Sequence, residues 1–186
     1  WTMSCEYWMP MVEKLKESHL CLIYDARGFG RSQPLGPEAG VEIDDHAEDL
    51  HELINGLGLG DVNLVAHGLG VWVALLSARR HPQDVATLTA VAPECELEEE
   101  DKVSEVPSIW KQASLLLKDL ASLPLLRNLV AWRYRRAPEP HRTRLCEDFA
   151  EADRRAAYHM LAGCMGKENQ QRLRRTFGEV SLPVLL

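Results

Sequence analysis

Residues 62–70 read Val-Asn-Leu-Val-Ala-His-Gly-Leu-Gly, and this short stretch decides the expected fold. Its first half is apolar and β-branched, which is typical of a buried strand. The glycines that follow, with the small Ala66 just before them, permit a tight turn from the strand directly into a helix. The stretch therefore predicts a strand, a sharp turn and a helix that packs closely on the strand.

The same stretch has the pattern of a nucleophile elbow, in which a small residue, the nucleophile and a glycine alternate with variable residues. Ala66 and Gly70 occupy the two small positions, and His67 and Leu69 flank the centre. Gly68 stands at the centre, where it offers no oxygen, sulfur or carboxylate with which to attack a substrate. We therefore expect the architecture of a nucleophilic site without its nucleophile.

Two further runs predict strands. Residues 20–24, Leu-Cys-Leu-Ile-Tyr, are short and apolar, as expected of a strand that is buried on both faces. Residues 87–92 form another such run, which Pro93 closes. Between the first strand and the elbow, residues 25–32 contain two glycines that permit a tight reversal of the chain.

Helical patterns separate these strands. Asp44 and Asp45 indicate the N-cap of a helix whose apolar positions recur at helical spacing up to Leu57. A second helix is expected from about residue 70 to residue 80, where His-Pro stops it. Strands that alternate with helices favour the α/β class, with a doubly wound and mostly parallel sheet.

Three motifs together resemble the α/β-hydrolase fold family. They are the Asp-x-Arg-Gly-x-Gly-x-Ser loop at 25–32, the Asp-Asp-His-Ala-Glu-Asp-Leu helix start at 44–50 and the elbow at 63–70. Their order and spacing are similar to those of the branch that holds epoxide hydrolases, dehalogenases and esterases. The resemblance implies a helical cap inserted after the strand that follows the elbow helix, and it places His67 beneath the turn, away from the site.

The resemblance also implies a division of the chain. Residues 1–93 correspond to a partial α/β-hydrolase core, residues 94–180 to the helical cap (lid), and residues 181–186 to the start of the next core strand. Caps of this family shape the substrate pocket, so a small-molecule ligand is expected under this one. The candidate pocket residues are Leu69, Trp110, Trp132, Tyr158 and Met160. For each residue taken singly, the alternative is that its side chain packs the cap against the core and lines no pocket.

By the same resemblance, other parts of a working site are missing. In the family, the oxyanion loop lies before a Trp-rich helix start that resembles residues 1–8. The family's usual acid and general-base histidine lie after the strand that resembles residues 182–186. Two functions are therefore open. One is a catalytically inactive binding or assembly subunit, and the other is the middle of a serine-type hydrolase of ester, epoxide or similar substrates whose nucleophile at position 68 was removed.

The family's sheet also has a strand between those at 20–24 and 62–66. Three alternatives follow: the two strands pair directly, a protein partner supplies the middle strand, or the 186 residues are a fragment. A supplied strand would bind by β-augmentation, in which main-chain hydrogen bonds provide the affinity.

Composition excludes several classes of function. The net charge of −7 and the absence of a binding module disfavour nucleic acid, and no run of 18 apolar residues predicts a membrane span. Five cysteines, an odd number without a Cys-x-x-Cys pair, indicate reduced intracellular thiols, in the cytoplasm or an organelle.

No metal or cofactor is expected from the sequence. The acidic residues and histidine at 44–49 have the spacing of a capped helix start, which explains them without a metal. Gly28-Phe29-Gly30 lacks the third glycine of a dinucleotide fingerprint.

Overall fold

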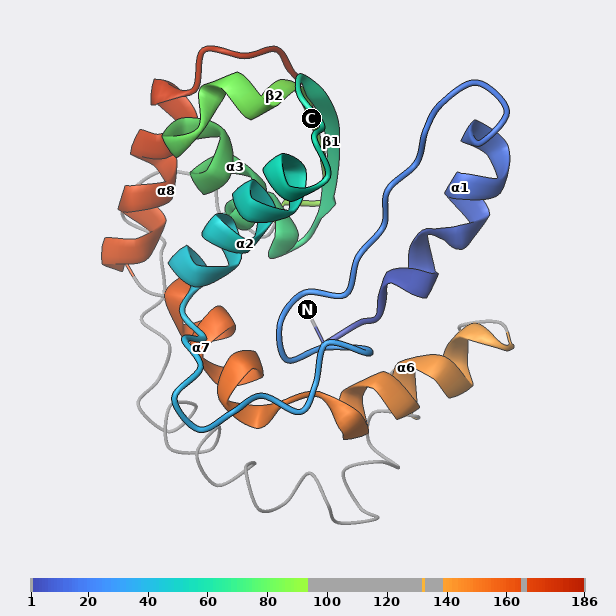
Figure 1. Ribbon diagram of the computed structural model, residues 1–186. Helices are drawn as coiled ribbons and strands as arrows, with labels where there is room; N and C mark the ends of the chain where they lie inside the picture. The colour runs from blue at the N-terminus through green and yellow to red at the C-terminus, as the bar shows by residue number, and fades with distance from the viewer. Residues whose placement is uncertain (1, 94–131, 133–138, 165–166, 186) are drawn as a thin grey trace. The chain divides into compact units, whose positions relative to one another are not determined.

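The computed structural model describes residues 2–93, 132, 139–164 and 167–185 (Figure 1). The chain divides into two compact units. The first contains Gly40–Pro107 and Tyr158–Leu186, and the second contains Thr2–Ala39 and Ser108–Ala157. Of the expected cap, residues 94–131 and 133–138 lie outside the described residues, so its boundaries stay a prediction.

The first unit contains a parallel sheet of three strands. Their order is β1 (Val62–His67), β2 (Val85–Val91) and β3 (Val184–Leu185), and both pairings are parallel. His67 lies opposite Val91, so β1 and β2 end at the same edge of the sheet. The mostly parallel α/β sheet expected from the sequence is confirmed. The strands predicted near 62–66 and 87–92 are β1 and β2.

Helix α3 (Gly70–Arg80) is the core of this unit. Every residue from 71 to 78 is buried, which is the pattern of a helix covered on all sides. It contacts β1, β2, η2 (Pro82–Asp84), α2 (Ile43–Gly56) and α8 (Lys167–Glu179). The small and apolar residues of α3 therefore hold the sheet and the helices of this unit around one core.

The start of α2 differs from the sequence prediction. Its N-cap is Glu42, and the Asp45 carboxylate accepts the Glu42 N–H at 2.8 Å in a capping box. Asp44 lies inside the helix, where its carboxylate accepts two hydrogen bonds from the Arg172 guanidinium, at 2.6 and 2.9 Å. It also pairs with Arg80. Asp44 thus joins α2 to α3 and α8, which no local capping pattern reveals.

In the second unit, the N-terminal segment packs on α6 (His141–Glu151). This segment is Ser4 with η1 (Cys5–Trp8), which α1 (Met9–Leu15) follows. The buried Asp148 carboxylate accepts the N–H of Ser4 at 2.8 Å. These contacts join stretches of chain that are about 140 residues apart in the sequence.

The loop at 25–32 forms the tight reversal that the sequence predicts. The Asp25 carboxylate accepts the backbone N–H groups of Cys5 at 2.6 Å and Arg31 at 3.0 Å. Burial alone would raise the pKa of Asp25, but these N–H donors outweigh it and hold the pKa below its usual value. Gly28, with φ of +81°, faces the start of α7 (Arg154–Cys164), where a Cβ would clash with Ala156. The loop is therefore held by its carboxylate and requires its glycine.

Residues 20–24 do not form the expected strand. The segment has no strand assignment, and Leu20 and Leu22 are 89% and 46% exposed. A strand needs a neighbour to pair its backbone N–H and C=O groups, and no described segment pairs with this one. The prediction of a strand buried on both faces is wrong here, and direct pairing of 20–24 with 62–66 stays a prediction.

Two further sequence expectations concern the environment of the chain. Within the described ranges, no helix is long and apolar enough to cross a bilayer, and α2 has 14 residues where about 20 are needed. Cys5, Cys21, Cys146 and Cys164 are free thiols. Cys95 lies outside the described residues.

The ion pair of Asp44 gives a stability prediction. Asp44→Asn should lower the free energy of unfolding by about 1 kcal/mol at pH 7, because the guanidinium of Arg172 loses its charged acceptor. Hydrogen bonds from Arg172 lower the pKa of Asp44. The difference in unfolding free energy between the two proteins should therefore be fully present above the usual aspartate pKa. It should fade as the pH falls through the lower pKa that Asp44 has in the folded protein. Urea unfolding across this range measures it, with Glu52→Gln on the same helix as control.

Candidate functional site

The turn between β1 and α3 has the geometry of a nucleophile elbow. β1 ends at His67 and α3 begins at Gly70, so the turn is two residues long. Gly68 has φ of +56°, in the left-handed region that residues with a side chain rarely adopt. Its N–H donates to the carbonyl of Val91 at 3.0 Å, and its carbonyl accepts the N–H of Val71 at 3.1 Å. The apex is thus fixed to β2 on one side and to α3 on the other.

The residues next to the apex differ in how far they are buried. Ala66 and Leu69 are buried, at 9% and 2% exposure, whereas His67 is exposed. The exposure of His67 contradicts the expectation that it packs beneath the turn. Val91, its register partner on β2, is 41% exposed, so the described residues leave both strand ends uncovered here. A Cβ at Gly70 would meet no described atom within 4 Å. The close packing predicted at Gly70 is therefore not seen among the described residues.

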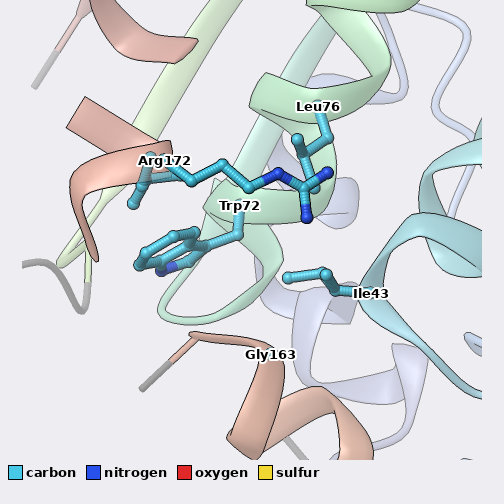
Figure 2. A pocket seen from close by; sticks show the side chains of 6 residues that line it. Ile43, Trp72, Leu76, Gly163 and Arg172 are labelled. Carbon is cyan, nitrogen blue, oxygen red and sulfur yellow. The ribbon is translucent and has the colours of Figure 1, made fainter. Parts of the chain in front are cut away.

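A small cavity lies in the first unit (Figure 2). It is lined by Ile43, Trp72, Leu76, Gly163, Arg172 and Leu173, from α2, α3, α7 and α8. Its volume is about 10 Å³, which is room for about one water molecule and far below a ligand pocket. This cavity is a packing defect between helices, and not a substrate site.

The candidate pocket residues have different environments. Leu69 and Met160 are buried, Tyr158 is half-buried and Trp132 is 59% exposed. Trp110 lies outside the described residues. None of the four described candidates lines the cavity. Their part in a substrate pocket stays a prediction.

Histidine–carboxylate pairs occur in the first unit, and sequence reasoning missed them. His51 Nδ1 lies 2.6 Å from Asp84 Oδ2, and His159 Nδ1 lies 2.6 Å from Glu42 Oε1. Asp84 directly precedes β2, so it lies at the opposite end of the sheet from Gly68. A six-residue strand spans about 20 Å, so the His51–Asp84 pair cannot serve the elbow as a base.

The chain belongs to the α/β-hydrolase fold family. The family model, described as alpha/beta hydrolase fold, matches residues 1–154. This agrees with the parallel sheet and with the strand–turn–helix at Gly68.

The relatives with curated names are hydrolases. The chain is 33% identical over 88 residues to RutD of Caulobacter segnis, which is named as a carbamate hydrolase, with 47% of this chain and 33% of RutD covered. It is 33% identical over 82 residues to the 2-(acetamidomethylene)succinate hydrolase of Mesorhizobium japonicum, covering 44% of this chain and 29% of that protein. The chain thus spans about a third of the length of the curated relatives that it matches.

Solved structures share the fold. A hydrolase of Oleispira antarctica matches with a TM-score of 0.76 at 15% identity, covering 99% of this chain and 68% of that one. A bromoperoxidase of Bacillus anthracis matches with a TM-score of 0.75 at 21% identity and the same coverage. At these identities the likeness shows the fold alone.

The two glycines of the turn should respond differently to alanine. Gly68→Ala should lower the free energy of unfolding by about 1–2 kcal/mol, because its φ of +56° places a Cβ in strain. Gly70→Ala should be neutral or stabilise by up to about 1 kcal/mol, because the site is open and helical. Thermal and denaturant unfolding of the two variants measures this contrast. An equal loss in both would contradict the assignment of strain to residue 68.

Proposed function

We propose that this chain is a catalytically inactive α/β-hydrolase-fold protein that acts as a binding or assembly subunit. One observation carries the proposal: glycine occupies the apex of the elbow, with φ of +56°. At this apex the family mechanism needs an attacking atom, and glycine offers none.

The environment of the histidines supports the same proposal. A nucleophilic hydroxyl needs a base within hydrogen-bond reach. The rings of His51 and His81 lie beside Asp84 and Glu48, at the end of the sheet away from the elbow. A hydroxyl restored at position 68 would therefore find neither of these imidazoles as its base.

Restoring the hydroxyl tests the proposal. Gly68→Ser should show no fluorophosphonate labelling above the unaltered protein, and no turnover of p-nitrophenyl esters. Gly70→Ser is the matched control, because it adds the same hydroxyl two residues further on, at an open position. Circular dichroism should first establish that both variants are folded. Labelling and turnover in Gly68→Ser alone would contradict catalytic silence.

That contrary result would favour a second function. In it, the chain is the middle part of a working serine-type hydrolase of ester, epoxide or similar small substrates, whose nucleophile at position 68 was removed. The hydrolase names of its relatives and the intact elbow backbone support this alternative. Those relatives are named for different substrates, so their names favour hydrolysis without favouring one substrate.

The assembly role rests on the outer edge of β1. Among the described residues β1 pairs with β2 alone, which leaves its other edge open to a strand from a protein partner. A small molecule under the cap is the other ligand that the fold suggests. Native mass spectrometry should then show the 21.0 kDa chain within a larger complex. A species of 21.0 kDa alone, under native conditions, would contradict the assembly role.

A further inference from the structure

Three side chains from three elements converge at the end of the sheet away from Gly68, in the first unit. His51 comes from α2, His81 follows the last turn of α3, and Asp84 comes from η2. One ligand atom of each lies within 4.8 Å of the others. The three elements belong to one unit, so their arrangement is described within that unit.

The two imidazoles lie against each other beside the carboxylate. Their ring centroids are 3.5 Å apart and the planes differ by 9°. His51 Nδ1 lies 2.6 Å from Asp84 Oδ2. The side chain of Asp84 is 4% exposed, whereas those of His51 and His81 are 27% and 20% exposed. A buried carboxylate is therefore covered by two rings that solvent still reaches.

Neighbouring groups hold these rings in place. Glu48 Oε2 lies 3.1 Å from His81 Nε2, and Glu48 is itself bound by Arg80 at 2.7 Å. A histidine that ligates a metal usually donates its other ring N–H to a carboxylate, which fixes the tautomer and the ring orientation. With Nε2 bound to Glu48, Nδ1 of His81 keeps its lone pair for a ligand.

We propose that His51, His81 and Asp84 form a binding site for a divalent transition metal of the zinc class. Two imidazole nitrogens and one carboxylate oxygen are a donor set that suits Zn²⁺. Metal–ligand distances near 2.0–2.1 Å set neighbouring donors about 3.3 Å apart, so the 2.6 Å contact must lengthen by less than about 1 Å. One imidazole must also turn out of the stack when the ion binds, because the lone pairs of parallel rings 3.5 Å apart do not converge on one ion. The ion joins α2 to the connection between α3 and β2, and a water completes its coordination.

Metal binding to the purified chain tests the site. After chelator treatment, calorimetry with Zn²⁺ should show one ion per chain, and Co²⁺ should give the visible absorption of a tetrahedral site. Zn²⁺ should also raise the melting temperature, because it binds the folded state. No binding by the unaltered protein when Zn²⁺ is in excess over the chain would overturn the proposal.

Matched variants locate the ion. His51→Gln and Asp84→Asn should each weaken Zn²⁺ binding by about 100-fold or more, and Glu48→Gln by about 10-fold to 100-fold as a residue that only orients His81. His159→Gln is the control, since His159 also contacts a carboxylate in this unit but lies outside the cluster. Equal affinity in His51→Gln and the control would overturn the site.

A measurement without any variant covers the case in which these substitutions prevent folding. X-ray absorption of the zinc-loaded, unaltered protein should show nitrogen and oxygen neighbours near 2.0–2.1 Å with imidazole scattering. Sulfur neighbours near 2.3 Å would instead place the ion on the free cysteines, and would overturn the proposal.

Discussion

The burial of α3 is the constraint on which the first unit depends. Residues 71 to 78 are all buried, so this helix must be covered by strands on one side and helices on the others. The chain must therefore pass from the end of β1 into the core within two residues. Gly68 makes that passage with φ of +56°, a conformation that costs a residue with a side chain about 1–2 kcal/mol. The strain at the apex follows from the packing of the helix behind it.

Electrostatics then fixes the helices around this core. Asp44 binds Arg172 and Arg80, and Glu48 binds Arg80 and contacts His81. These charges lie one turn apart on α2, so a single helix face is tied to α3 and α8. The same face carries His51 toward Asp84, because His51 and Glu48 are three residues apart. The geometry of the proposed metal site thus depends on the ion pairs that hold α2 against α3 and α8.

The sequence predicts the elements that depend on local pattern. Residues 62–70 form the strand, turn and helix as expected, since apolar periodicity and glycine act over a few residues. The predicted burial of this strand is wrong in the described structure, where Ala66 is the one buried residue of β1. Residues 20–24 are equally apolar, yet a strand also needs a paired neighbour, which local pattern does not reveal. The role of Asp44 and the cluster at Asp84 were missed for a related reason. Their partners lie 128 and 33 residues away along the chain, and no spacing motif links them.

The two ends of the sheet differ in what they offer chemically. The elbow end keeps the backbone of a nucleophilic site but has glycine at its apex, which removes the strain that a nucleophile would store there. The opposite end has imidazoles and a buried carboxylate held by neighbouring charges. Within the described part of the first unit, these imidazoles and this carboxylate lie at the strand starts and the elbow lies at the strand ends, so the donors for an ion and the family's elbow are separate places on one sheet.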